Sequence, residues 1–195
     1  MEEADSTDAP MTEAQIIAAT VGQRKPSNST IYLAPYNPQW PSHFSQLEQL
    51  IRTALGDKVL LLKHVGSTSV PGLAAKPIID MVLVVADGDD EPAYVVPLEQ
   101  KGFTLHIRES DGHRLLKAPD IKGNLHVFSV GCSDIEDLLL FRDRLRSHAE
   151  DRQLYESTKR ELAARVWKYT QNYADAKSAV VQKILARARK AQHSL

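Results

Sequence analysis

The sequence predicts an α+β protein, with a mixed β-sheet in its first two thirds and helices gathered in its last third. Apolar, β-branched runs at 59–65, 78–85 and 123–130 are typical of strands. After Gly131 the apolar residues recur at spacings of three and four, as in amphipathic helices. Strands followed by helices favour an α+β class with helices packed on a mixed sheet.

The elements expected in the first part follow from periodicity and from Gly and Pro breakers. Residues 1–30 are polar and weakly patterned, so we expect a flexible extension with a short helix near 13–20, ahead of one domain over 31–195. Along that domain the pattern predicts, in order, a helix at 42–55 ended by Gly56, a strand at 59–65, a Gly-Ser turn, a strand at 78–85, a loop at 87–92 and a helix at 93–101.

The second part begins with a hairpin, because 103–108 and 113–117 flank the turn residues Ser110-Asp111-Gly112. A strand at 123–130 follows. A capping box of Ser133 and Glu136 then starts a C-terminal three-helix region. Its helices are expected at 133–148, 150–171 and 173–192.

Composition narrows the classes of function. The chain has 195 residues, 43% of them hydrophobic, and a net charge of −1, which gives no overall footprint for nucleic acid or an anionic membrane. Its single cysteine, Cys132, excludes an intrachain disulfide framework. No apolar stretch approaches the roughly 18 residues that cross a bilayer. We expect a cytoplasmic protein whose partner is a small molecule, and the oligomeric state is left open.

Asp80 stands inside the run 78–85, which is apolar on both faces. A buried carboxylate without a partner costs several kcal/mol. We therefore expect a metal or a cationic side chain near it.

The turn Gly66-Ser67-Thr68 follows the preceding strand, and small residues there let N–H and hydroxyl groups converge on an oxyanion. Lys76 adds a phosphate contact. The alternative is an ordinary turn with a solvated loop lysine.

Cations on the three C-terminal helices share stripes with apolar residues. Lys159 lies at helical spacing from Tyr155 and Leu162, and Lys177 from Tyr173 and Val180. On the first of these helices the corresponding cations are Arg142 and Arg146. Snorkelling explains any one of them, but cations on three successive helices favour a shared anionic target.

His64 ends the strand before the Gly-Ser turn, Asp80 lies on the next strand, and His126 lies on the last strand. With Asp80 the two histidines would suit acid/base catalysis or one divalent metal, which is the cofactor this set would hold. The alternative is that each is a buried structural histidine.

One resemblance rests on Tyr36-Asn-Pro-Gln-Trp-Pro41, His64-Val-Gly-Ser-Thr-Ser-Val-Pro-Gly-Leu73, Ala75-Lys-Pro-Ile-Ile-Asp80, Phe141-Arg-Asp-Arg-Leu-Arg146, Tyr155 with Lys159, and Tyr173 with Lys177. On these motifs the chain resembles the GrpB family over about residues 31–192, which implies a nucleotidyltransferase-like fold. In some bacteria this family also occurs as a domain fused to dephospho-coenzyme A kinase.

The sequence departs from the nucleotidyltransferase pattern at two of its three carboxylates. In that fold a second metal-binding carboxylate follows two residues after the first, and here that residue is Val82. The later strand, 123–130, has His126 where the third carboxylate would stand, and no acid at all. We therefore expect an enzyme that acts on an anionic or phosphorylated small molecule without two-metal chemistry. The alternatives are a non-catalytic nucleotide-binding or phosphometabolite-binding module, and a lyase, cyclase or hydrolase on the same scaffold.

Overall fold

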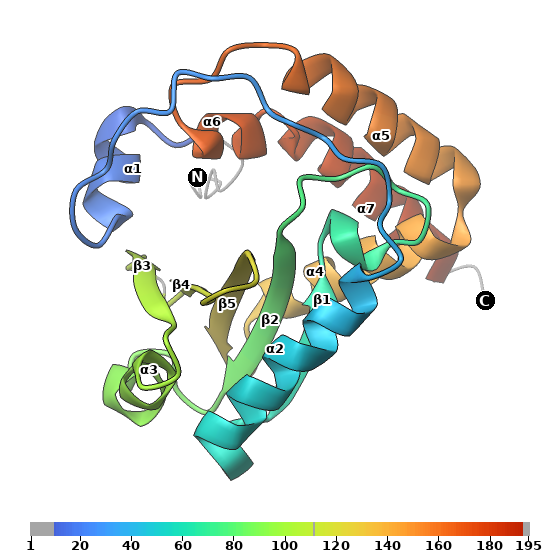
Figure 1. Cartoon of the computed structure of the whole chain (residues 1–195). Helices are drawn as coiled ribbons and strands as arrows, with labels where there is room; N and C mark the ends of the chain where they lie inside the picture. Colours follow the sequence, from blue (N-terminus) through green and yellow to red (C-terminus); the bar gives the residue numbers. More distant parts are fainter. Residues whose placement is uncertain (1–9, 111, 193–195) are drawn as a thin grey trace, which may run out of the picture.

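The computed structural model describes residues 10–110 and 112–192, which form one five-stranded sheet and its covering helices (Figure 1). The helices are α1 (Glu13–Ala19), α2 (Trp40–Leu55), α3 (Glu91–Glu99), α4 (Ser133–Ser147), α5 (Ala149–Ala163), α6 (Thr170–Asp175) and α7 (Ser178–Gln192). The strands are β1 (Leu61–Val65), β2 (Ile79–Val85), β3 (Thr104–Arg108), β4 (Arg114–Lys117) and β5 (Gly123–Ser129), with short 3₁₀ turns η1 (Gly56–Lys58) and η2 (Ser67–Ser69).

The sheet is mixed, as the α+β class requires. Its order is β1-β2-β5-β4-β3, with β2 and β5 parallel and the other neighbours antiparallel. The expected hairpin is confirmed as β3 and β4, while its tip residue Asp111 lies outside the described residues. Placing β2 between β1 and β5 puts its apolar residues at the centre of the molecule.

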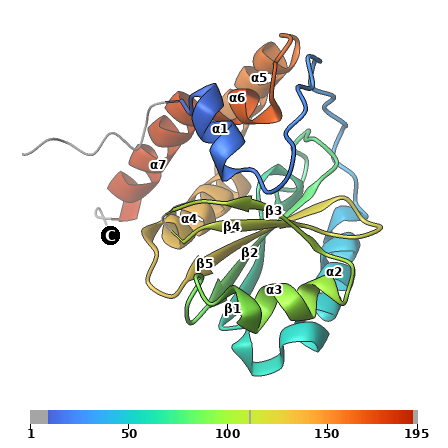
Figure 2. The same ribbon diagram turned by 90° about the vertical axis from the view of Figure 1, so that its left-hand side faces the viewer.

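The two faces of the sheet carry different layers (Figure 2). Because side chains alternate along a strand, Met81 and Leu83 of β2 point toward α2 and α3 and join the main core. Val82 points the other way and packs with Val65 and Phe128 beneath α4. Asp80 shares this second face with Val82, so it faces the C-terminal helices.

The C-terminal region has four helices among the described residues, where three were expected. Helix α5 ends at Ala163 because the backbone of Trp167 pairs with Ser29 in both directions, at 3.0 and 3.3 Å. The Trp167 indole also donates to Leu162 O at 2.8 Å. The partner strand comes from the distant N-terminal segment, so local periodicity could not predict this break.

Residues 10–30, expected as a flexible extension, lie against the domain. Helix α1 buries Ile16, and Glu13 accepts hydrogen bonds from Lys168 Nζ and Tyr169 Oη. Residues 1–9 lie outside the described residues, and the boundary at residue 30 stays a prediction. None of the helices in the described ranges has the length and apolarity to cross a bilayer.

Candidate functional site

The turn after β1 brings the backbone directly against Asp80. Gly66 has a φ of 67°, a left-handed conformation that favours glycine. A Cβ at Gly66 would lie 2.7 Å from Asp80 Oδ2. The Ser69 hydroxyl donates to the Gly66 carbonyl at 2.6 Å and closes the turn. Glycine is therefore needed here both for its conformation and for the close approach of the carboxylate.

Asp80 is half-buried near the start of β2 and is bound by an amide. Its Oδ1 accepts from Asn124 Nδ2 at 2.7 Å, and Asn124 Oδ1 accepts from Lys117 Nζ at 2.7 Å. Burial raises the pKa of Asp80, while this hydrogen bond and the charges of Lys76, Lys177 and Lys117 oppose the rise. Within the described residues the carboxylate has no ion-pair contact, so the expected cations act on it from a distance.

Lys159 of α5 lies at the junction between the helices and the turn. It is 2% exposed, and its Nζ donates to Ser67 Oγ at 3.0 Å and to the Ala74 carbonyl. The ammonium also lies 4.8 Å from the centre of the Tyr155 ring. Burial, and then the charge of Lys177, lowers the pKa of Lys159 to about 7. An amine that titrates near neutrality can take up or release a proton at ordinary pH.

The ring of Tyr173 lies near two further lysines. Lys177 Nζ is 4.8 Å from its centre and Lys76 Nζ is 5.7 Å away. Burial lowers the pKa of both lysines, and the charge of Lys177 lowers that of Lys76 further. The Tyr173 hydroxyl is buried and has no hydrogen-bond partner among the residues described. Buried hydroxyls are normally bonded, so this one is an uncommitted polar group beside two cations.

Three half-buried lysines, Lys76, Lys117 and Lys177, thus act on Asp80 by charge, and the charge of Lys177 in turn acts on the buried Lys159. We call Lys76, Lys117, Lys159 and Lys177, together with Asp80, the lysine site. Cations withdrawn from water cost free energy unless an opposite charge meets them. Two other carboxylates act on these lysines, Glu156 on Lys159 and Asp175 on Lys177, and Glu156 is itself paired with Arg160 at 2.6 Å. The remaining excess of lysines over carboxylates makes this site electrostatically suited to an anion.

His64 does not join the lysine site. It pairs in register with Met81, so its side chain points to the α2 face, where it stacks on Phe44 at 5.0 Å. Its Nε2 lies 3.0 Å from Thr68 Oγ1, which itself donates to Ile78 O at 3.1 Å. Since the threonine hydrogen is used there, His64 carries its proton on Nε2. Both His64 and Thr68 therefore hold the turn in place, on the far side of the sheet from Asp80.

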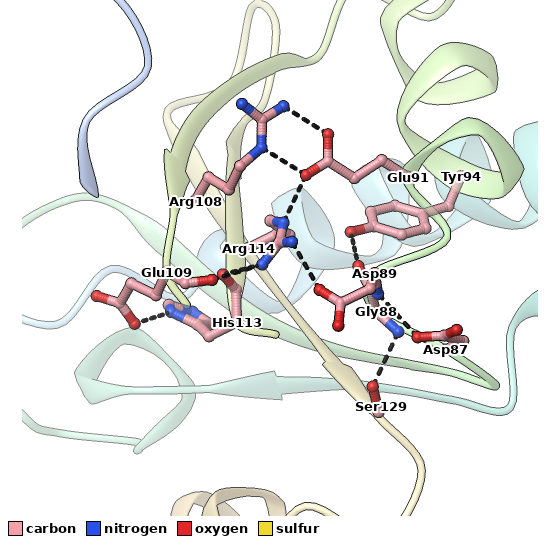
Figure 3. A network of polar contacts seen from close by, with 10 residues as sticks. All are labelled: Asp87, Gly88, Asp89, Glu91, Tyr94, Arg108, Glu109, His113, Arg114 and Ser129. Carbon is pink, nitrogen blue, oxygen red and sulfur yellow. Dashed lines mark hydrogen bonds and ion pairs between the residues drawn. The ribbon is translucent and has the colours of Figure 1, made fainter. Parts of the chain in front are cut away.

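His126 shares the face of Asp80 but bonds elsewhere. Its Nδ1 lies 3.0 Å from His113 Nε2, and His113 Nδ1 lies 2.7 Å from Glu109 Oε2 (the Glu109–His113 contact appears in Figure 3). Burial first, then the charges of His113 and Lys117, lowers the pKa of His126 to about 3. The structure thus places His126 in a separate chain of polar contacts.

The carboxylates of Asp89 and Glu91, which follow β2, are already paired with arginines. Figure 3 shows Arg114 between Asp89 and Glu91, at 2.8 and 2.6 Å, with Arg108 on the same Glu91. The hydrogen bond from Arg108 is the main cause that lowers the pKa of Glu91 to about 2. This network lies at the opposite end of β2 from Asp80, so these carboxylates do not complete a metal site there.

Arg142 and Arg146 lie behind the turn. Arg142 Nη1 donates to His64 O at 3.2 Å, and Arg146 donates twice to Ser69 O, at 3.0 and 2.8 Å. They line a cavity with His64, not with Lys159. The structure therefore places Lys177 near Asp80 and Lys159 near Lys177, but separates the two arginines from them.

The residues present do not form a metal centre. In the described ranges no three His, Cys, Asp or Glu side chains are grouped to hold an ion. His64 lies on the face opposite Asp80, and His126, on the same face, is bonded to His113. Val82, in the position of a second carboxylate, is fully buried with Val65. We derive no step through a metal.

Sequence reasoning did not identify four residues as part of the site: Asn124, Lys117, and Tyr155 and Tyr173 with their hydroxyls. Burial raises the pKa of Tyr155 to about 12, and a hydrogen bond with Ser67 opposes the rise. The two tyrosines stand on the same helical stripes as the site lysines, which is a signal the sequence does contain.

Comparisons with known proteins agree with this fold. A family model described as GrpB protein matches residues 30–187. UPF0157 protein BH1888 of Halalkalibacterium halodurans is 51% identical over 185 residues, covering 94% of this chain and 95% of that protein. UPF0157 protein SCO7215 of Streptomyces coelicolor is 40% identical over 178 residues, covering 86% and 95%. The crystal structure of GrpB from Enterococcus faecalis matches with a TM-score of 0.72 at 28% identity, covering 83% of this chain and 99% of that one.

The sheet, the Gly-Ser turn and the covering helices thus define an α+β protein with the fold of a solved GrpB structure. The family match spans most of the chain. This chain belongs to the GrpB family.

The contact between Gly66 and Asp80 predicts the cost of Gly66→Ala. The change adds a Cβ 2.7 Å from the carboxylate at a left-handed φ. Gly72→Ala is the matched control, because Gly72 has a φ of 78° and open space around it. We expect Gly72→Ala to lose about 1 kcal/mol of unfolding free energy in urea and Gly66→Ala about 2–3 kcal/mol more. Equal losses would show that the carboxylate does not press on the turn.

His64 predicts a loss of stability in acid. Its pKa in the fold is about 4, below the ordinary 6.5, because of burial and then the charges of Arg146 and Arg142. As the pH falls from 6.5 toward 4 the unfolded chain binds the proton first, so stability present above pH 6.5 is lost in that window. Each such histidine removes roughly 2 kcal/mol by about pH 5.

The measurement is urea unfolding of wild type and His64→Gln at about pH 7.5 and pH 5. The glutamine amide can still donate to Thr68, and His43→Gln on α2 serves as control. We expect His64→Gln to lose clearly less stability on acidification than wild type, and His43→Gln to behave as wild type. An acid loss in His64→Gln as large as in wild type contradicts the assignment.

Proposed function

We propose that this GrpB-family protein is an enzyme that binds an anionic, phosphorylated small molecule at the lysine site. The observation that carries the proposal is the excess of lysines over carboxylates in a half-buried setting. Phosphoryl oxygens accept strong charge-assisted hydrogen bonds from ammonium groups. A turn of small residues such as Gly66-Ser67 also lets a phosphate come close to the Ser67 hydroxyl.

Individual residues have distinct parts in this proposal. Lys76, Lys117 and Lys177 provide positive charge, and Ser67 supplies a hydroxyl next to Lys159. The Tyr173 hydroxyl, which lacks a partner among the described residues, supplies a further donor. Binding of an anion replaces the water that these groups give up and so offsets the cost of burying them.

Lys159 is the proposed proton-transfer group. Its pKa of about 7 lets it exist as amine or ammonium, and its Nζ is 3.0 Å from Ser67 Oγ. Two-metal nucleotidyl transfer requires bridging carboxylates, and Val82 supplies none. The proposed chemistry therefore relies on lysine charge to neutralise the anion, with Asp80 orienting the group that reacts.

A binding module that has no turnover is the second candidate. Lys159 donates hydrogen bonds to Ser67 and Ala74, as a lysine with a purely structural role would. A lyase, cyclase or hydrolase would use the same anion contacts with a different proton transfer. The two experiments below separate binding from reaction.

Lys159→Met keeps the stem and removes the charge. We expect it to weaken binding of pyrophosphate, ADP and dephospho-coenzyme A about tenfold or more in isothermal titration. In wild type the affinity should fall from about pH 6.5 to 8.5, because the free amine must take up a proton to meet the anion. The variant should lose this dependence. Lys101→Met, at an exposed lysine, is the control, and unchanged affinity in Lys159→Met contradicts the proposal.

Asp80→Asn distinguishes an enzyme from a binder. Radiolabelled nucleoside triphosphates are incubated with a broad acceptor mixture, with and without magnesium or manganese, and all labelled products are resolved. We expect a product other than a nucleotidyl adduct, lost in Asp80→Asn while binding of the same probe is retained; Asp57→Asn is the control. Nucleotidyl transfer that vanishes in Asp80→Asn contradicts the exclusion of two-metal chemistry. Tight binding with no product from any probe favours the binding module.

A further inference from the structure

A cavity lies at the β1 edge of the sheet, apart from the lysine site. It is half-open, has a volume of about 890 Å³, and lies between the start of α2, β1, the turn and helices α4 and α5. This volume falls in the range of small-molecule sites. Asp80, Lys159 and Lys177 do not line it. The cavity is therefore not the lysine site seen from another side.

Its lining is strongly cationic. Lys63, Arg142, Arg146 and Arg152 contribute four positive charges, and no carboxylate is among the lining residues. The nearest acid partner is Asp143, which pairs with Arg142 at 2.7 Å and with Arg146 at 3.6 Å and is largely exposed. One exposed carboxylate leaves most of the charge uncompensated.

Two of these cations keep donors available for a ligand. Arg152 bonds through Nη1 to the carbonyls of Leu145 and Arg146, and it has no carboxylate partner within the described residues. Lys63 is exposed and has no hydrogen bond from its ammonium there. Guanidinium groups bind phosphate through paired N–H donors, which suits a group placed between arginines.

The opposite wall is made of rings. His64 stacks on Phe44 with planes 9° apart, and Tyr36 lies at the same cavity against Trp40. His64 is uncharged at neutral pH, since burial and the two arginines hold its pKa near 4. This wall offers flat, uncharged surface next to the cations, so it fits the apolar part of a ligand whose other end is anionic.

We propose that this cavity is a second binding site, for a phosphorylated small molecule whose phosphate lies among Lys63, Arg142, Arg146 and Arg152. It is independent of the lysine site, because the two share no lining residue. The apolar part of the ligand lies against Phe44 and Tyr36. A phosphate without an organic part binds the same cations more weakly.

The experiment follows the imidazole signals of His64 by NMR in the full chain, with pyrophosphate and AMP as probes. Signals are assigned with His64→Gln. We expect both probes to shift His64 saturably below about 10 mM, with AMP the tighter, while adenosine and potassium chloride at matched ionic strength leave it in place. Lys63→Gln and Arg152→Gln should each weaken binding about five- to tenfold. Lys63→Gln removes no hydrogen bond or ion pair among the described residues, so it tests binding even if Arg152→Gln is unstable.

Two controls decide where the probe binds. Arg52→Gln, on the exposed side of α2, should bind as wild type. Lys159→Met should leave the His64 shifts unchanged, even if it abolishes binding at the lysine site. The proposal is overturned if His64 does not respond, if chloride or adenosine gives the same shifts, or if Lys159→Met removes them. Since each site has its own variants, failure here and failure of the proposed function are distinguishable.

Discussion

The buried ammonium of Lys159 joins the C-terminal helices to the sheet, and the rest of the site depends on it. From α5 it reaches across to Ser67 and Ala74, which belong to the loop between β1 and β2. A buried ammonium group is costly unless its N–H groups are hydrogen-bonded, and here the Ser67 hydroxyl and the Ala74 carbonyl accept those bonds. The bond to Ser67 fixes how α5 approaches the turn. Because α5 packs on α7, this bond also fixes where Lys177, just before α7, places its charge relative to Asp80.

Apolar burial on the other face of the sheet offsets the free energy lost by gathering lysines on this one. There β2 contributes Met81 and Leu83, fully buried against α2 and α3, to the largest apolar cluster. Burial of this kind stabilises by about 25 cal/mol per Å² of apolar surface. A central strand can thus be apolar on one side and carry a carboxylate at the start of the other. Asp80 sits at the end of β2 where the apolar layer gives way to the lysines, while Val82, two residues on, is already in the core.

Much of this arrangement could be predicted from the sequence, and what could not has a physical reason. A β-branched run identified β2 and marked Asp80, and helical spacing placed Lys159 and Lys177 toward the sheet. His64 was grouped with Asp80 because it ends the neighbouring strand. Its face depends on register, and the pairing of Val65 with Asp80 puts His64 on the opposite side. Register is set by contacts distant in sequence. The break after α5 has the same cause, because its partner is an N-terminal segment.

Arg142 and Arg146 show the limit of helical spacing as a guide to a site. Spacing says which face of α4 they occupy, but it does not say which side of the Gly-Ser turn that face meets. The turn is bound from both sides: by Lys159 through Ser67, and by Arg146 through the Ser69 carbonyl. The hydrogen bonds from His64 to Thr68 and from Thr68 to the Ile78 carbonyl add a third constraint on the turn. A turn restrained in this way is preorganised, so a ligand at Ser67 need not order the backbone as it binds. The same contacts that hold this turn rigid therefore place cations on both of its sides. Lys159 lies on the side of the lysine site, and Arg146 lies on the side of the cavity at the β1 edge.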